Sequence, residues 1–173
     1  DMTRQICYNI SISLLCLKMD KKLRSSKYPS DNLQKSVSNI IKVVKALVKG
    51  EYDRQTIAST LGYNSDSGSA RASIASLTHF GLLKNTHSKY LITEIAHQIT
   101  HPTNEDERIE AIKKAAKSPT LFSNIIAKYG NDDFKLPTRE GLKSIIIREY
   151  NILPKVADKV VSNICDSLLF AEI

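Results

Sequence analysis

Hydroxyl, basic and small side chains gather between residues 67 and 89, where they could bind a phosphate backbone and the edges of bases. The set comprises Ser67, Ser69, Arg71, Ala72, Ser73, Lys84, His87 and Lys89. Arg71 has a guanidinium that can make a bidentate contact to guanine, and serine hydroxyls can bond to bases or phosphates. Lys84, His87 and Lys89 could add phosphate contacts, which contribute affinity without reading the base sequence. This set is therefore a candidate nucleic-acid-binding site.

The elements that must position these residues are a helix pair and a strand pair. A short helix is expected to end at Gly62, where glycine can adopt the left-handed conformation that follows a helix C-terminus, and a second helix follows the polar stretch 64–69. This second helix stops at Gly81. Two short apolar runs then flank the polar residues 85–88, as strands around a wing would. The pattern predicts a winged helix-turn-helix with a small β-wing, which most often binds nucleic acid.

The second helix of the pair would be the recognition helix. Its buried stripe is predicted as Ala70, Ile74, Leu77 and Phe80, and its outward residues as Arg71, Ala72, Ser73, Ala75, Ser76, Thr78 and His79. Replacing Leu77 by alanine is therefore expected to destabilise the fold, and replacing Ser76 to be nearly silent. The outward side chains are small, and only one of them carries a permanent charge. Two functions therefore stay open for this helix: it contacts DNA with low sequence specificity, or it docks on a protein.

Short motifs in a fixed order extend this pattern along the chain. They are Lys27-Tyr28-Pro29, Leu61-Gly62-Tyr63, Ser67-Gly68, Arg71, Leu77, Phe80-Gly81-Leu82, Leu91-x-Thr93, Pro102, Ser118-Pro119-x-Leu121-Phe122, Leu136-Pro137 and Leu153-Pro154-x-x-Ala157. In this order they resemble an uncharacterised prokaryotic family of unknown function. The resemblance implies an N-terminal winged-helix domain and a helical C-terminal half, and no activity. Members of such a family are expected to have further basic residues directly after the position of Arg71. This chain has Ala72 and Ser73 there, and this difference counts against DNA binding.

Charge is distributed unevenly along the 173 residues, whose net charge is +7. Residues 1–102 hold 14 Lys or Arg and 7 Asp or Glu, whereas residues 103–173 hold 11 of each. A basic N-terminal part is the electrostatic footprint expected of a phosphate-binding module. The alternative is a lysine-rich surface without a function.

The helix before the pair is expected to begin with Asp31 or Ser30 as its N-cap and to end near Gly50. Its apolar stripe is Leu33, Val37, Ile40, Ile41, Val44, Leu47 and Val48. Its lysines, Lys35, Lys42, Lys45 and Lys49, are predicted to form one solvated stripe on the opposite side. Such a stripe is usually only a solvated face, so these lysines are not assigned to DNA.

Four helices are predicted for the C-terminal helical region, residues 103–173. They are expected to begin at Asn104, at Ser118-Pro119, at Thr138 and at Pro154. The last helix is apolar over two adjacent stripes, which is too wide for one partner surface. It is therefore expected either in the core of the chain or in a homodimer or protein interface.

Cysteine usage and hydropathy bear on location. Cys7, Cys16 and Cys165 have no paired spacing, which favours a reducing cytoplasm over a disulfide framework. The longest apolar stretch, residues 6–17, is too short to span a bilayer, and no small-residue cleavage site follows it. The sequence predicts a cytoplasmic protein with no membrane partner.

The N-terminal extension, residues 1–26, precedes the winged-helix domain predicted for residues 27–102. Met19 stands shortly before the first of the family-like motifs. We therefore expect the native start at Met19, with residues 1–18 as upstream sequence. An ordinary additional strand or helix packed on the core is the alternative.

Catalytic motifs are not found in the sequence. It has neither a phosphate-cradling glycine loop nor a nucleophile elbow, so no catalytic residue, cofactor or enzymatic activity is predicted. Glu94, His97 and His101 have the spacing of metal ligands on one side of a helix, but His101 stands directly before Pro102, where a helix should end. These histidines are interpreted as surface or helix-end residues, and no metal is predicted.

Overall fold

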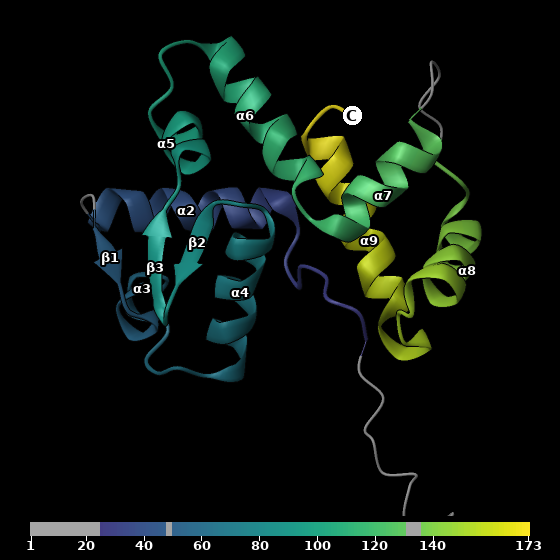
Figure 1. Ribbon diagram of the computed structural model, residues 1–173, viewed down its shortest axis with the longest axis horizontal. Coiled ribbons are helices and arrows are strands. Elements are labelled where there is room, and N and C mark those ends of the chain that lie inside the picture. Colours follow the sequence, from purple (N-terminus) through teal and green to yellow (C-terminus); the bar gives the residue numbers. More distant parts are fainter. Residues whose placement is uncertain (1–24, 48–49, 131–135) are drawn as a thin grey trace, which may run out of the picture.

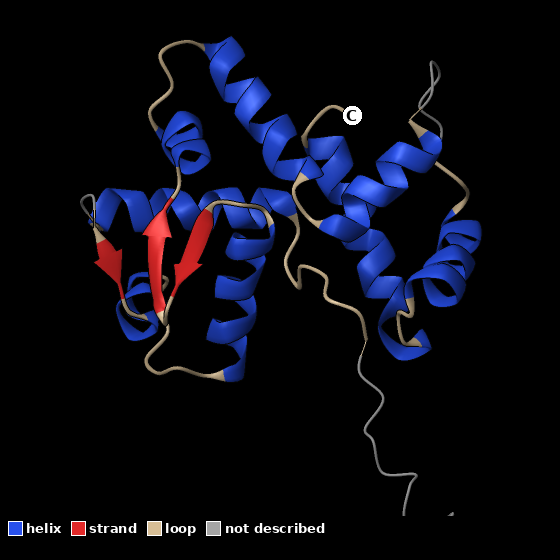
Figure 2. Cartoon of the chain, viewed as in Figure 1, coloured by secondary structure: helices blue, strands red, loops and turns tan. Residues whose placement is uncertain are grey.

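The computed structural model describes residues 25–47, 50–130 and 136–173, and shows a mainly helical chain with one small sheet (Figures 1 and 2). Its elements are α2 (Leu33–Ala46), β1 (Glu51–Tyr52), α3 (Arg54–Thr60), α4 (Gly68–His79), β2 (Leu83–Thr86), β3 (Lys89–Ile92), α5 (Glu94–Thr100), α6 (Glu105–Lys117), α7 (Thr120–Tyr129), α8 (Arg139–Tyr150) and α9 (Pro154–Phe170). The predicted mainly-α class is confirmed. The predictions for Met19 and for residues 1–24 lie outside the described residues.

Most of the predicted helix starts are confirmed, and that of α2 is wrong. Asn104 and Thr138 cap α6 and α8 by accepting hydrogen bonds from backbone amides, and α9 begins at Pro154. The N-cap of α2 is Asn32, which accepts from the backbone N–H of Lys35 at 3.0 Å. Asp31 does not serve as the cap because its carboxylate is bonded elsewhere, to Lys35 Nζ and to the hydroxyl of Ser73.

The end of α2 also differs from the prediction. The helix ends at Ala46, and Leu47 already has an extended backbone. Val48 and Lys49, which were assigned to its two stripes, lie outside the described residues. Lys35, Lys42 and Lys45 are exposed, as predicted.

Three antiparallel strands form the sheet, in the order β1-β3-β2. The β2–β3 turn is tighter than predicted, because Asn85 and Thr86 pair within β2 and only His87 and Ser88 connect the strands. Both turn residues have positive φ, 46° and 80°, as the two-residue turns that suit twisted hairpins require. Strand β1 was not predicted, because two residues are too few to show an alternating pattern.

The core continues from the sheet into the C-terminal helices. Ala70, Ile74, Leu77 and Phe80 of the α4 region are buried, which confirms the predicted stripe. The ring of Phe80 meets that of Phe122 on α7 edge to face, with centroids 5.8 Å apart. One cluster of buried apolar residues therefore runs from α2 and α4 into α7, α8 and α9.

Helix α9 is mostly buried within the chain. Burial in the core was one of the two predictions for its two adjacent apolar stripes; an interface with another chain was the other. Val160, Val161, Ile164 and Leu168 are all at most 3% exposed. Leu169 differs from them, with an exposed fraction of 79%. The width of the apolar surface on α9 is thus explained mainly by contacts inside the chain.

The prediction that Ser73 and Ser76 of α4 face outward is wrong. Both are buried, at 3% and 0% exposed. The Ser76 hydroxyl accepts from the backbone N–H of Ser30 at 2.9 Å and of Asp31 at 3.1 Å, and donates to Ala72 O. The segment before α2 crosses α4 here, and its unpaired amides need an acceptor. This contact joins residues far apart in the sequence, so helical periodicity could not reveal it.

Residues 29–33 also bond to α9, and we call them the linking segment. The side-chain amide of Asn163 donates to Pro29 O at 3.2 Å and to Ser30 O at 3.0 Å. Ser167 Oγ accepts from the backbone N–H of Leu33 at 2.9 Å. The linking segment therefore holds α4 and α9 in place through hydrogen bonds between its backbone groups and side chains of the two helices.

Ser76→Ala is expected to destabilise the protein by about 1–3 kcal/mol, because it leaves two backbone amides without an acceptor. Leu77→Ala should cost about 2–5 kcal/mol, as a large-to-small change in a core does. Ser69→Ala, on the exposed side of the same helix, is the control and should stay within about 0.5 kcal/mol of wild type. Urea denaturation monitored by circular dichroism measures all three. Equal stabilities for the Ser76 and Ser69 variants would contradict the assigned role of Ser76.

Candidate nucleic-acid interface

The first turn of α4 is open to solvent. Ser67 caps the helix by accepting from Ala70 N at 3.2 Å, and its hydroxyl lies 3.0 Å from that of Ser69. Apart from its chain neighbours and the nearby backbone of α4 itself, no atom lies within 4 Å of the place where Gly68 would carry a Cβ. In Figure 1 the α3–α4 loop and the β2–β3 turn lie at the same end of the sheet. A ligand could therefore approach the start of α4 and the hairpin from one side.

Asp66, directly before this turn, holds two arginines. Its Oδ2 lies 3.0 Å from Arg71 Nη2 and 3.3 Å from Arg54 Nη1. The hydrogen bond from Arg71, helped by the one from Arg54, lowers the pKa of the Asp66 carboxyl below its ordinary value. Arg71, the only Lys or Arg on α4, is 61% exposed but has its charge offset by Asp66.

Arg54 joins the start of α4 to the sheet. Besides its contact to Asp66, its Nε donates to the hydroxyl of Tyr90 on β3 at 3.5 Å. Sequence reasoning missed this residue, because Arg54 and Asp66 are twelve positions apart and belong to no motif. A basic residue after the capping Asp53 is compatible with any exposed helix start, so the sequence contained no signal for its role.

The hairpin carries the other predicted basic residues. Lys84 and His87 are exposed and form no ion pair or hydrogen bond with any residue that the structure describes. Lys89 Nζ lies 3.9 Å from Glu51 Oε2, and Thr86 Oγ1 donates to Glu51 Oε1 at 3.5 Å. The hairpin therefore presents two unpaired basic side chains and one loosely paired lysine.

The structure brings together only part of the predicted site. Ser67, Ser69 and Arg71 share the open turn, whereas Ala72 is half-buried. Ser73 must be removed from the candidate site, because its buried hydroxyl donates to Asp31 Oδ2 at 2.7 Å and lies 3.0 Å from the hydroxyl of Tyr63. The surface that remains is a first helical turn flanked by a hairpin.

Acidic side chains reduce the positive charge of this surface. Asp66 and Glu51 pair with its cations, and Asp53 caps α3 by accepting from Thr56 N at 2.7 Å. Asp66 is only 29% exposed, and its Oδ1 is buried without a hydrogen-bond partner, whereas Glu51 and Lys89 are 46% and 58% exposed. A phosphate could therefore displace Glu51 from Lys89 more easily than Asp66 from the two arginines, because exposed ion pairs are weak.

The predicted metal candidate does not form one face. Helix α5 ends at Thr100, and His101 leaves it with φ −136° and ψ 60°. The His101 ring nitrogen Nδ1 lies 3.1 Å from the hydroxyl of Thr100. Within residues 25–47, 50–130 and 136–173, no three His, Cys, Asp or Glu side chains are placed to hold a metal ion.

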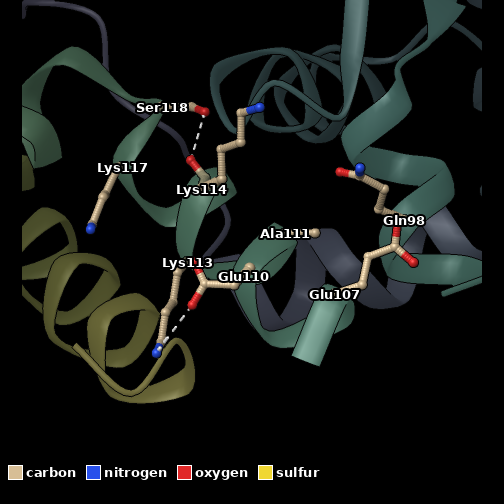
Figure 3. A pocket seen from close by; sticks show the side chains of 8 residues that line it. All are labelled: Gln98, Glu107, Glu110, Ala111, Lys113, Lys114, Lys117 and Ser118. Atoms are coloured by element: carbon tan, nitrogen blue, oxygen red, sulfur yellow. Dashed lines mark hydrogen bonds and ion pairs between the residues drawn. The ribbon is translucent and has the colours of Figure 1, made fainter. Parts of the chain in front are cut away.

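A hollow of about 530 Å³ lies between α5 and α6 (Figure 3). Its charged groups do not converge on one point. Lys113 Nζ lies 3.8 Å from Glu110 Oε1, the Glu107 carboxylate accepts from Thr103, and Lys117 points away from Gln98. The hollow has no acid–base pair aimed at a common ligand.

Comparison with known proteins does not place the chain in a family. No protein-family model matches the sequence, and no curated protein or solved structure matches it either. The resemblance to a prokaryotic family therefore stays a prediction. None of the described helices has the length and apolar character needed to cross a bilayer.

The pKa of Asp66 provides a test of the Arg71–Asp66 contact. In Arg71→Gln the pKa of the Asp66 carboxyl should rise toward its ordinary value, because the strongest hydrogen bond that stabilises the carboxylate is lost. The pKa of Asp53 is lowered mainly by the backbone N–H of Thr56, so it should not change and is the internal control. A carbon-detected NMR titration of both carboxyls measures the effect. An unchanged Asp66 pKa would show that Arg71 does not hold this carboxylate in solution.

Proposed function

We propose that the chain is a non-enzymatic winged helix-turn-helix module that binds duplex DNA mainly through the phosphate backbone. The order of α2, β1, α3, α4, β2 and β3 supports this architecture, with α3 and α4 as the helix pair and β2–β3 as the wing. The observation that carries the proposal is the pair of arginines held by Asp66 beside the open first turn of α4.

Phosphate binding follows from the physical properties of that turn. The first amides of a helix lack intrahelical partners, and the helix dipole favours an anion there. The side chains of Arg54 and Arg71 are 43% and 61% exposed, so their N–H groups that do not contact Asp66 can donate to a phosphate. Lys84 and Lys89 on the hairpin add contacts to further phosphates, which give affinity without base readout.

Low sequence specificity is part of the proposal. The exposed or half-exposed residues in the middle of α4 are Ala72 and Ala75, which cannot donate or accept hydrogen bonds through their side chains. Arg71 is the one side chain of α4 able to make a bidentate base contact. The helix can therefore approach the duplex closely while distinguishing few base pairs.

A protein-docking platform is the second candidate function. The observation in its favour is the same small, uncharged middle of α4, together with the neutralisation of Arg71 by Asp66. Charge-poor surfaces are typical of the centres of protein interfaces, whereas DNA interfaces are strongly positive.

Fluorescence polarisation with a labelled mixed-sequence duplex at about 50 mM and about 200 mM salt tests DNA binding. Arg71→Ala should cost about 1–3 kcal/mol of binding free energy if it reads a base. Lys84→Ala combined with Lys89→Ala should weaken all sequences alike and lower the log–log salt slope by about two units. Lys155→Ala, at the exposed start of α9, is the control and should leave affinity unchanged. Absence of binding by the wild type at the lower salt concentration would reject DNA binding in favour of protein docking.

Asp66→Asn distinguishes the two candidate functions more sharply. It removes the negative charge beside Arg54 and Arg71, which repels a phosphate and competes for both guanidinium groups, so DNA affinity should rise. Polarisation titration against the same duplex measures the affinity. Unchanged DNA affinity in a folded Asp66→Asn variant would contradict the proposed role of the two arginines.

A further inference from the structure

A polar groove of about 650 Å³ runs between α2 and α9, separate from the open turn of α4. The charged and amide side chains that line it are Asp31, Asn32, Gln34, Lys35, Asn39, Lys42, Lys159 and Asn163. The groove therefore combines residues from two helices that are far apart in the sequence and pack against each other.

Two buried carboxamides lie in this groove. Asn39 is 9% exposed and Asn163 is 8% exposed. Asn163 donates to the linking segment, whereas the Asn39 side chain forms no hydrogen bond with any residue that the structure describes. The Oδ1 and Nδ2 atoms of Asn39 are not among the described buried polar atoms that lack a partner, so they reach solvent in the groove. Asn39 therefore has an accessible donor and acceptor at the wall of the groove.

Charge in the groove favours an anion. Lys35 is paired with Asp31 at 2.8 Å, which balances one positive and one negative group. Lys42 and Lys159 have no ion-pair partner among the residues described. Lys42 lies one turn after Asn39 on α2, and Lys159 lies one turn before Asn163 on α9. Two ammonium groups thus flank the buried amides from opposite helices.

We propose that this groove binds a phosphate group, with Lys42 and Lys159 neutralising its charge and the Asn39 amide donating a hydrogen bond to one of its oxygens. Lysine binds phosphate as a point charge, and two lysines from different helices match a dianion. The phosphate belongs either to a small phosphorylated molecule or to a nucleic-acid backbone. The proposal does not depend on the proposed function of α4.

Titration of the ¹⁵N-labelled full chain with sodium phosphate tests the site, with sodium chloride at matched ionic strength as the reference. The side-chain NH₂ signals of Asn39 and Asn163 should shift saturably with phosphate and not with chloride. Lys42→Gln combined with Lys159→Gln should weaken binding about tenfold or more, because both charge-assisted contacts are lost. Lys45→Gln, exposed on the same helix but outside the groove, is the matched control and should bind like wild type.

Two further titrations distinguish the source of the phosphate. Ribose 5-phosphate that binds more tightly than inorganic phosphate would assign the groove to a small phosphorylated molecule. Duplex DNA that shifts the Asn39 signal when ribose 5-phosphate does not would assign it to a nucleic-acid backbone. Shifts that are equal in phosphate and chloride, or an equal loss in the Lys45→Gln control, would overturn the proposal. The replaced lysines are exposed, so all variants are expected to fold.

Discussion

The hydrogen bonds of the linking segment, residues 29–33, are the constraint on which the rest of the structure depends. Ser76 on α4 accepts from two of its amides, while Asn163 and Ser167 on α9 bond to its carbonyls and to the amide of Leu33. Backbone groups taken out of water must be paired, so this segment cannot leave α4 or α9 without leaving donors and acceptors unsatisfied. The helix pair and the C-terminal helices are thereby fixed relative to each other through α2.

This constraint also determines which part of α4 stays free. Two serines that could have faced a ligand are used inside the protein, because Ser73 bonds to Asp31 and Ser76 to the linking segment. Only the first turn and a strip of small residues are left exposed. The structural requirement therefore narrows the proposed interface to its N-terminal end, where a helix is best suited to bind an anion.

Charge pairing has an equally direct effect on the proposed interface. Asp66 keeps Arg54 and Arg71 near the start of α4 and lowers their net charge in the free protein. Such an arrangement orients the cations in advance while limiting nonspecific attraction to other anions. In the groove between α2 and α9 the positive charge is not offset in this way. Two lysines there, Lys42 and Lys159, lack acidic partners among the described residues, and Asn39 lacks a hydrogen-bond partner among them.

The sequence by itself determined the elements whose signals are local. The buried stripe of α4, the caps at Asn104 and Thr138 and the start of α9 at Pro154 follow from helical periodicity and capping chemistry, which act over a few residues. Tertiary structure decided the burial of Ser73 and Ser76, the Arg54–Asp66–Arg71 contact and the pairing of two-residue β1. Each of these depends on a partner brought near by folding, and neither the spacing nor the type of a residue specifies which distant segment will lie against it.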